Sequence, residues 1–170
     1  MNSFPDASKP LDVILRPETP THANFSPYGV LIEPSDYGKA YDDDEPTLDL
    51  SAGQPRFYIM RSPYHGLSFT RITRHRLVTQ CLAAREDKDW FIAVAPPGAS
   101  ATAPNPDSLH AFHVPGHMGI KLHRGTWHAG PFFKWDWVDF FNLELTDTNQ
   151  TDSDHAELNE RFGITCSFDV

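Results

Sequence analysis

The chain has 170 residues, with 14 Lys and Arg against 23 Asp and Glu and a formal net charge of −9. A chain of this length fits one domain with a sizeable core. The negative charge disfavours binding to nucleic acid or to an anionic membrane surface, and no apolar run approaches the roughly 20 residues that span a bilayer. Cys81 and Cys166 are the two cysteines, and their spacing disfavours a disulfide framework or a thiolate zinc site.

The first residues, MNSFPDASKPLD, carry neither the basic region nor the apolar stretch of a secretory signal. We therefore expect a cytoplasmic protein. We interpret residues 1–12 as a flexible leader ahead of a single domain over residues 13–170.

The first structured elements are expected between residues 21 and 45. Thr21 is a candidate helix N-cap, and Gly29 would close a short helical turn before the strand VLIE. Asp42, Asp43, Asp44 and Glu45 then form an acidic run. A calcium loop has spaced ligands and a central glycine that this run lacks, which favours a solvated surface loop.

From Arg56 onward, short β-rich segments alternate with turn residues. A helix is expected over residues 152–163, capped near Ser153 and stopped by Gly163, and the last segment, ITCSFDV, reads as a half-buried edge strand. This pattern predicts an all-β fold, an antiparallel barrel or jelly roll with one or two short helices, which binds small ligands in its interior. The expected strands cover residues 56–60, 66–72, 77–83, 90–95, 109–114, 119–123 and 137–145.

The segment LHRGTWHAG, residues 122–130, contains two histidines five positions apart. A continuous strand would point His123 and His128 to opposite faces. A turn at Arg124-Gly125 would reverse the chain and bring both to one side. If Ile120 and Leu122 pack outward, Lys121 and His123 face the same interior.

Two segments resemble the motifs of the cupin superfamily. HRGTWH resembles the second cupin motif, Pro-x-Gly-x-x-His, in which Gly125 and His128 take the glycine and metal-ligand positions. TRHRLVTQ resembles the first motif, His-x-His followed after four residues by Glu, with Thr73, His75 and Gln80 at the three positions. The resemblance implies a cupin double-stranded β-helix and a metal set of His75, Gln80 and His128.

The chain is more similar to one cupin family, ureidoglycolate lyase (also called ureidoglycolate hydrolase). Its Arg-His…Leu…Gln and His-Arg…Trp-His patterns and its early Tyr-Gly-x-x-Ile-Glu are echoed here. The resemblance implies a carbon–nitrogen (amidine-type) lyase of purine and allantoin breakdown, which splits ureidoglycolate into glyoxylate and urea, and it favours a homodimer. The matching residues are Tyr28–Glu33, Arg74, His75, Leu77, Gln80, Leu122, His123, Arg124, Trp127 and His128.

The chain also departs from the family pattern. An acidic loop replaces the Asn-Asn-Gly segment, Arg76 and Val78 replace a Pro and a Gly, and Ala129 replaces a second histidine. We therefore expect a divergent member. Two alternatives stay open: another cupin enzyme acting on a small carboxylate, and a non-catalytic cupin that binds a small acid.

The residue types suggest distinct roles. His123 is the expected acid–base catalyst, or else a turn histidine paired with Asp136 or a backbone carbonyl. Gln80 either ligates a metal or hydrogen-bonds the substrate. Two histidines and a neutral oxygen would hold nickel, manganese or zinc weakly, and no organic cofactor is expected. The cations expected to hold the substrate carboxylate, or else to balance surface acids, are Lys121, Arg61 and Arg74.

Overall fold

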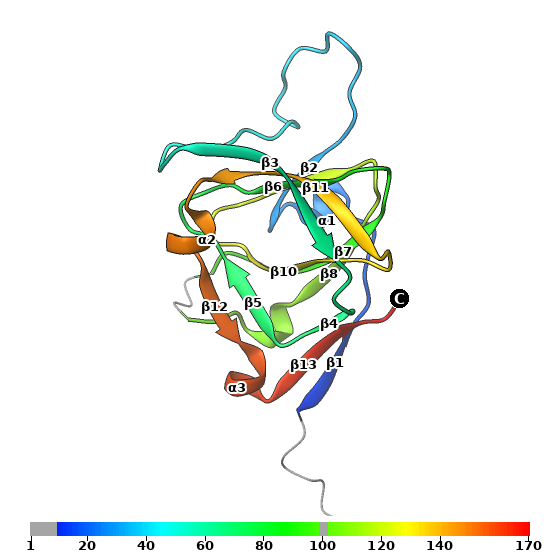
Figure 1. Cartoon of the computed structure of the whole chain (residues 1–170), viewed down its shortest axis with the longest axis vertical. Helices are drawn as coiled ribbons and strands as arrows, with labels where there is room; N and C mark the ends of the chain where they lie inside the picture. Colours follow the sequence, from blue (N-terminus) through cyan, green and yellow to red (C-terminus); the bar gives the residue numbers. More distant parts are fainter. Residues whose placement is uncertain (1–9, 99–101) are drawn as a thin grey trace, which may run out of the picture.

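Three sheets make up the part of the chain that the computed structural model describes, residues 10–98 and 102–170. They are stacked as layers, with one five-stranded sheet in the middle (Figure 1). The all-β, cupin-like fold expected from the sequence is confirmed, although the two larger sheets do not close into one continuous barrel. None of the described helices is long and apolar enough to cross a membrane.

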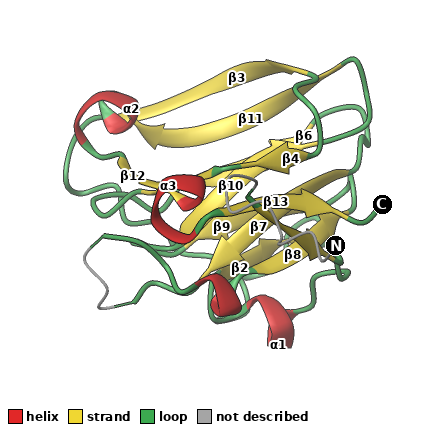
Figure 2. Cartoon of the chain, turned by 90° about the horizontal axis from the view of Figure 1, so that it is seen from below, coloured by secondary structure: helices red, strands yellow, loops and turns green. Residues whose placement is uncertain are grey.

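The first five-stranded sheet is antiparallel and forms one outer layer. Its edge strand β3 pairs with β11 along the full length of both, and Figure 2 shows these two long strands side by side. The strands in spatial order are β2 (Gly29–Ile32), β9 (Gly119–Leu122), β6 (Cys81–Ala84), β11 (Trp137–Leu145) and β3 (Pro55–Pro63).

The second five-stranded sheet is the middle layer, and it is also antiparallel. Its strand β7 is buried at all six positions, because alternate side chains enter two different cores. This explains why the sequence WFIAVA is a continuous apolar run rather than an alternating one. The strands in order are β12 (Asp154–Glu157), β5 (Arg71–Arg74), β10 (Trp127–Phe132), β7 (Trp90–Ala95) and β8 (His110–Val114).

The third sheet has three strands and joins the two ends of the described chain. β1 (Leu11–Leu15) runs parallel to β13 (Ile164–Phe168), which pairs on its other side with β4 (Ser68–Phe69). β13 buries Ile164, Cys166 and Phe168, so the expected half-buried strand is confirmed up to Phe168, whereas Val170 is exposed. The expectation of an edge strand is wrong, because β1 covers the open side of β13.

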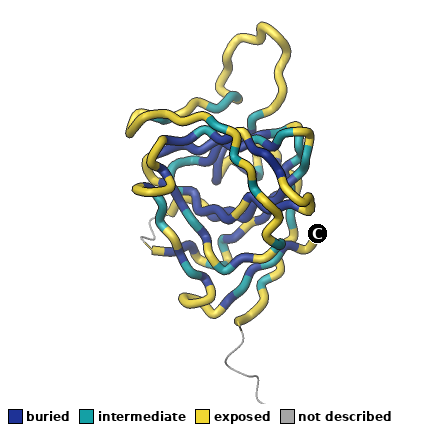
Figure 3. Tube along the Cα trace, in the orientation of Figure 1, coloured by how far each residue is buried: buried dark blue, intermediate teal, exposed yellow. Residues whose placement is uncertain are grey.

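Two hydrophobic cores lie between the layers, and Figure 3 shows the buried stretches of the strands in dark blue. One separates the middle sheet from the three-stranded sheet and includes Ile72, Trp127 and Phe168. The other lies between the two five-stranded sheets and includes Trp90 and Phe140.

The helices are short. α1 (His22–Phe25) has Thr21 as its N-cap, as expected, with a reciprocal capping box to Asn24. Gly29 does not close this helix but opens β2, where a Cβ would lie 2.1 Å from the main-chain oxygen of Lys121. The others are α2 (Thr148–Thr151), α3 (Leu158–Phe162) and a 3-10 turn at Pro106–Ser108.

The helix expected over residues 152–163 is only partly present. Its first half forms strand β12, which pairs with β5 and buries Ala156 in the core. Only α3 is helical, and it ends at Gly163 in the left-handed conformation (φ 63°). Tertiary pairing with β5 therefore outweighs the local helix preference.

Two expected loops are placed differently. Leu11 and Asp12, assigned to the leader, begin strand β1, and residues 1–9 lie outside the described residues. The acidic run 42–45 lies in the long exposed loop between β2 and β3 that projects from the body (Figure 1). There Lys39 Nζ pairs with Asp42 at 2.8 Å and with Glu45 at 3.4 Å.

Candidate functional site

A cavity of about 330 Å³ lies between the two five-stranded sheets. Inward-facing residues of several strands meet there, because side chains alternate between the faces of a strand. The lining combines polar side chains with apolar ones. It is formed by Tyr58, Met60, Arg71, Thr73, His75, Gln80, Leu82, His128, Ala129, Gly130, Pro131, Phe132, Asn142, Glu144, Asn149, Ser153 and His155.

The three expected metal ligands, His75, Gln80 and His128, all line this cavity. The imidazole rings of His75 and His128 have centroids 5.1 Å apart. All three side chains are buried. Two motifs that are far apart in the sequence therefore converge in space, as the resemblance implies.

The backbone holds both imidazoles through Nδ1. Nδ1 of His75 lies 2.5 Å from the main-chain oxygen of Asp152, and Nδ1 of His128 lies 3.2 Å from that of Thr126. A carbonyl oxygen only accepts, so each Nδ1 carries the proton and each ring keeps Nε2 for other partners. Burial, and secondly the nearby His75, lowers the pKa of His128 to about 3. His128 is therefore neutral near pH 7, with a lone pair on Nε2.

Asp152 organises the turn that carries His75. Its two carboxylate oxygens accept the backbone N–H groups of Arg76 and Leu77 at 2.7 and 2.8 Å. These bonds hold residues 76 and 77 out of the ladder, so β6 begins only at Cys81 rather than at the expected residue 77. The backbone N–H of Gly125 also donates to the main-chain oxygen of His75 at 2.6 Å, so a hydrogen bond connects the two cupin-like segments directly.

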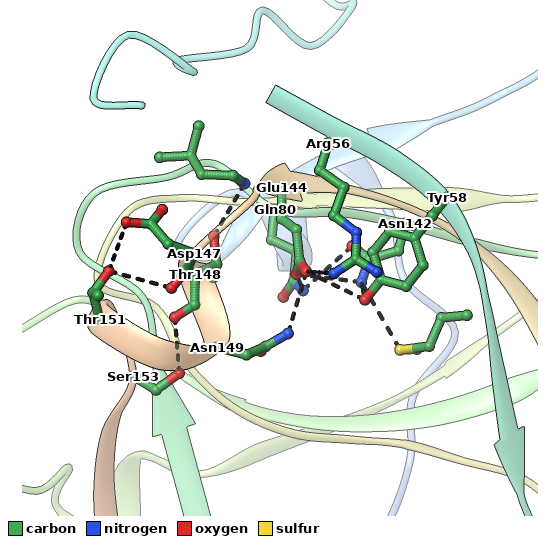
Figure 4. A network of polar contacts seen from close by, with 12 residues as sticks. Arg56, Tyr58, Gln80, Asn142, Glu144, Asp147, Thr148, Asn149, Thr151 and Ser153 are labelled. Carbon is green, nitrogen blue, oxygen red and sulfur yellow. Dashed lines mark hydrogen bonds and ion pairs between the residues drawn. The ribbon is translucent and has the colours of Figure 1, made fainter. Parts of the chain in front are cut away.

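Gln80 is held by a buried carboxylate (Figure 4). Its Nε2 donates to Glu144 Oε2 at 2.9 Å and lies 3.4 Å from Asn142 Oδ1. Glu144 Oε1 accepts from the Tyr58 hydroxyl and from Asn149 Nδ2, both at 3.2 Å. Both oxygens of Glu144 therefore accept hydrogen bonds, as those of an ionised carboxylate do. Burial, and then the neighbouring Glu144, raises the pKa of Tyr58.

His123 does not line the cavity, so the structure does not support its expected role as the acid–base catalyst. The turn does reverse the chain at Gly125 (φ 79°), and His123 lies beside the tightly packed group that contains His75 and His128. Its Nε2, however, is 3.1 Å from the main-chain oxygen of Ser26. The alternative of a turn histidine bonded to a backbone carbonyl agrees better with this geometry.

Lys121 faces away from the cavity. Ile120 and Leu122 enter the core between the sheets, so the condition under which Lys121 would face the interior is not met. Lys121 therefore lies on the other face of the sheet, opposite Cys81 in the register of β9 and β6. It is not placed to bind a substrate carboxylate in the cavity.

The two expected arginines are also engaged elsewhere. Arg61 forms a bidentate pair with Asp139, at 2.8 and 2.9 Å, and stacks on Trp137. Arg74 is buried over the ring of Trp127 and donates to Asp154 at 3.0 Å. Neither lines the cavity, and the alternative of balancing nearby acids describes Arg61 and Arg74 better.

Some polar residues of the cavity, among them Arg71 and His155, were not predicted from the sequence. Arg71 lies on β5 with the same parity as Thr73 and His75, and His155 Nδ1 is 2.9 Å from Thr73 Oγ1. Arg71 forms an ion pair with Glu157. The signal for Glu144 was available: in WVDFFNLEL, Val138, Phe140, Asn142 and Glu144 share one face, so two polar residues follow two core residues inward.

The side chains of His75, Gln80 and His128 decide whether a metal ion could bind in the cavity. Among the described residues, no group of three or more His, Cys, Asp or Glu side chains is arranged to hold an ion. His75 and His128 offer two nitrogens, and the third donor is the amide oxygen of Gln80, whose Oε1 is buried without a hydrogen-bond partner in the described part of the chain. Two imidazoles and an amide oxygen fit a borderline divalent ion, although this set of three contains no carboxylate to tighten the binding.

Comparison with protein families identifies the family to which the chain belongs. The family model described as ureidoglycolate lyase matches residues 12–165. The chain belongs to the ureidoglycolate lyase family. A comparison with curated proteins gave no significant match. The region that matches the ureidoglycolate lyase family includes every residue of the cavity, which makes the cavity the candidate active site.

Proposed function

We propose that this member of the ureidoglycolate lyase family cleaves ureidoglycolate to glyoxylate and urea in the cavity between the two five-stranded sheets. The observation that carries the proposal is the family match over residues 12–165, which spans all of the cavity lining. The reaction is a carbon–nitrogen lyase step of the amidine type. The changes at Arg76, Val78 and Ala129 mark the chain as a divergent member; of these, Ala129 lines the cavity.

The chemistry has three requirements. The substrate carboxylate must be held, the hydroxyl must lose its proton as the aldehyde of glyoxylate forms, and the departing urea nitrogen must gain a proton as the C–N bond breaks. Atoms balance without water, because the proton lost from oxygen equals the proton gained by nitrogen. One residue that first accepts and then donates would suffice.

Arg71 is the group we propose for the substrate carboxylate. It lines the cavity, it is exposed, and its Nε is engaged by Glu157. A guanidinium has five N–H donors in a planar fork, so Arg71 retains donors for a second carboxylate. Arg71 takes the role that the sequence pattern assigned to Lys121, Arg61 or Arg74.

His155 is the group we propose for proton transfer, in place of His123. It lines the same cavity, and Thr73 fixes its ring through Nδ1. Imidazole is the side chain best suited to exchange a proton near neutral pH. Both proposed groups belong to the paired strands β5 and β12, so one substrate could reach them together.

His75, Gln80 and His128 would hold a divalent metal, such as nickel, manganese or zinc, if the enzyme uses one. Bound there, the ion would polarise the substrate hydroxyl as a Lewis acid. We propose no organic cofactor. A homodimer and a cytoplasmic location are also part of this proposal; the family resemblance supports the first, and membership of a metabolic enzyme family supports the second.

The test is to incubate purified protein with ureidoglycolate and follow glyoxylate release, with chelator-treated samples and with each of the three metals added back. We expect glyoxylate and urea in equal amounts. Absence of glyoxylate under every condition would refute the proposed activity. A chelator-treated enzyme that retains full turnover would refute the metal requirement alone.

A further inference from the structure

The buried side chain of Gln80 leaves one atom unsatisfied. Gln80 is 8% exposed, it lines the cavity, and its Oε1 has no hydrogen-bond partner in the described part of the chain. Leaving a buried acceptor unpaired costs free energy, so native proteins rarely do so without a ligand or another function. The orphan oxygen therefore points to something that binds in the cavity.

Glu144 explains why the Gln80 amide does not rotate to give its Oε1 a hydrogen-bond donor. An amide can exchange the places of its oxygen and nitrogen by a rotation of its terminal bond. Here such a rotation would put Oε1 against Glu144 Oε2, now 2.9 Å from Nε2. An ionised carboxylate only accepts, so two acceptors would meet in a buried site.

The other contacts keep Glu144 in place. Asn142 Nδ2 donates to Oε2 at 3.3 Å, and Tyr58 and Asn149 donate to Oε1. Arg56 Nη1 lies 4.0 Å from Oε1, and its guanidinium stacks on the Tyr58 ring. Figure 4 shows these groups converging on Glu144 from β3, β11 and α2. The carboxylate is 1% exposed, so its charge acts on Gln80 with little screening by water.

We propose that Glu144 is a positioning residue that locks Gln80 with its Oε1 toward the cavity and thereby makes the buried end of the active site an acceptor-only surface. The three acceptors are Gln80 Oε1 and the Nε2 atoms of His75 and His128. Donation of Nε2 to a charged partner also polarises the Gln80 amide and strengthens Oε1 as an acceptor.

This polarity defines the chemistry of the ligand. An acceptor-only surface takes an electron-poor group, either a divalent cation or the N–H donors of a ureido group. The inference deepens the proposed function and rests on it for the ureido ligand. It orients the substrate, with the ureido end toward Gln80 and the carboxylate toward Arg71.

The decisive variant is Glu144→Gln. It is nearly isosteric, and the new amide can donate to Gln80 Oε1, so the Gln80 amide is free to turn and present Nε2 to the cavity. Two probes are titrated by calorimetry: Mn²⁺ alone, and N-carbamoylglycine, an unreactive ureido acid, with chelator-treated protein. We expect wild-type protein to bind at least one probe and E144Q to bind it at least tenfold more weakly.

The exchange Q80E/E144Q separates positioning from structural support. It keeps one carboxylate and one amide in contact with their places exchanged. The amide now at position 144 donates to the carboxylate now at position 80, whose second oxygen is left facing the cavity. We expect the exchange to restore binding of the probe to within threefold of wild type or better. The exchange also serves if E144Q fails to fold, because it retains the buried hydrogen bond.

Three results would overturn the inference: wild-type protein that binds neither probe, E144Q that binds as wild type does, or a folded exchange variant that stays unable to bind. These outcomes are distinct from failure of the proposed function. Glyoxylate release by wild type together with normal binding by E144Q would remove the role of Glu144 alone. Loss of binding by E144Q in a protein that releases no glyoxylate would remove the lyase activity alone.

Discussion

Nδ1 of His75 lies 2.5 Å from the main-chain oxygen of Asp152, and the same aspartate accepts the N–H groups of the two residues that follow His75. One residue between α2 and β12 thus fixes both the turn after His75 and the orientation of its ring. Asp152 does not itself line the cavity, so it acts on the site through His75 and through Ser153, its neighbour in the chain.

Replacing Asp152 with alanine is expected to lower the stability of the folded protein and to weaken ligand binding in the cavity. Two partly buried backbone donors lose their acceptor, which should lower the free energy of unfolding by about 1–3 kcal/mol. Urea denaturation measures this loss. Asp152→Asn is the control, because its single carbonyl oxygen retains one of the two bonds and should lose about half as much. Equal stability of D152A and wild type would contradict the role of Asp152.

His128 predicts how stability depends on pH. Its pKa falls to about 3 in the folded protein, against about 6.5 when unfolded, so between these values the unfolded chain binds the extra proton. Stability is thus present above pH 6.5 and is lost as the pH falls toward 3, by at most about 1.4 kcal/mol per unit from this group. Denaturation midpoints of wild type and His128→Gln, measured from about pH 7.5 down to about pH 4.5, show how much of the pH dependence of stability comes from His128. If stability falls with pH no more steeply in wild type than in H128Q, the prediction is contradicted.

A pair of histidine variants separates the two candidates for proton transfer. His155→Gln should lower kcat by about 10²–10⁴-fold, the usual contribution of a general acid–base group. His123→Gln should keep kcat within about threefold, because its Nε2 is bonded to Ser26 outside the cavity. Steady-state glyoxylate release measures both. The reverse ranking would restore the role that the sequence assigned to His123.

A matched pair of arginine variants tests substrate binding. Arg71→Ala should raise KM for ureidoglycolate about 10–100-fold, since a charge-assisted hydrogen bond contributes about 1.5–3 kcal/mol. Arg61→Ala removes an arginine of the same charge that does not line the cavity and should leave KM unchanged. If both variants raise KM equally, the effect comes from net charge, and Arg71 does not contact the carboxylate.

Most of the fold could be predicted because the strands carry local signals. The expected strands at residues 90–95 and 137–145 match β7 and β11 at both ends. The prediction of a helix over residues 152–163 is wrong in its first half because the local signals, a capping residue and a stop at Gly163, are compatible with a helix. Only its pairing with β5, far earlier in the chain, decides that residues 154–157 are extended.

The site was harder to predict than the fold. The cupin resemblance of their two segments implied that His75, Gln80 and His128 come together, and all three line the cavity. The prediction that Lys121 faces the cavity is wrong, because the direction of its side chain depends on which face of the sheet points inward. For β9, that is decided by Ile120 and Leu122 joining Trp90 and Phe112 in the core, an arrangement that no local pattern encodes.

The parallel pairing of β1 with β13 joins Leu11 to Ile164, almost the full length of the chain. Closing so long a loop is entropically costly, so this pairing is expected to form late in folding and to open first. Amide hydrogen exchange should then be fastest in β1 among the strands, while β7, covered on both faces, exchanges only through global unfolding. Strands β1 and β13 cover one core but contribute no residue to the cavity lining, so opening this pair should leave ligand binding in the cavity largely unchanged.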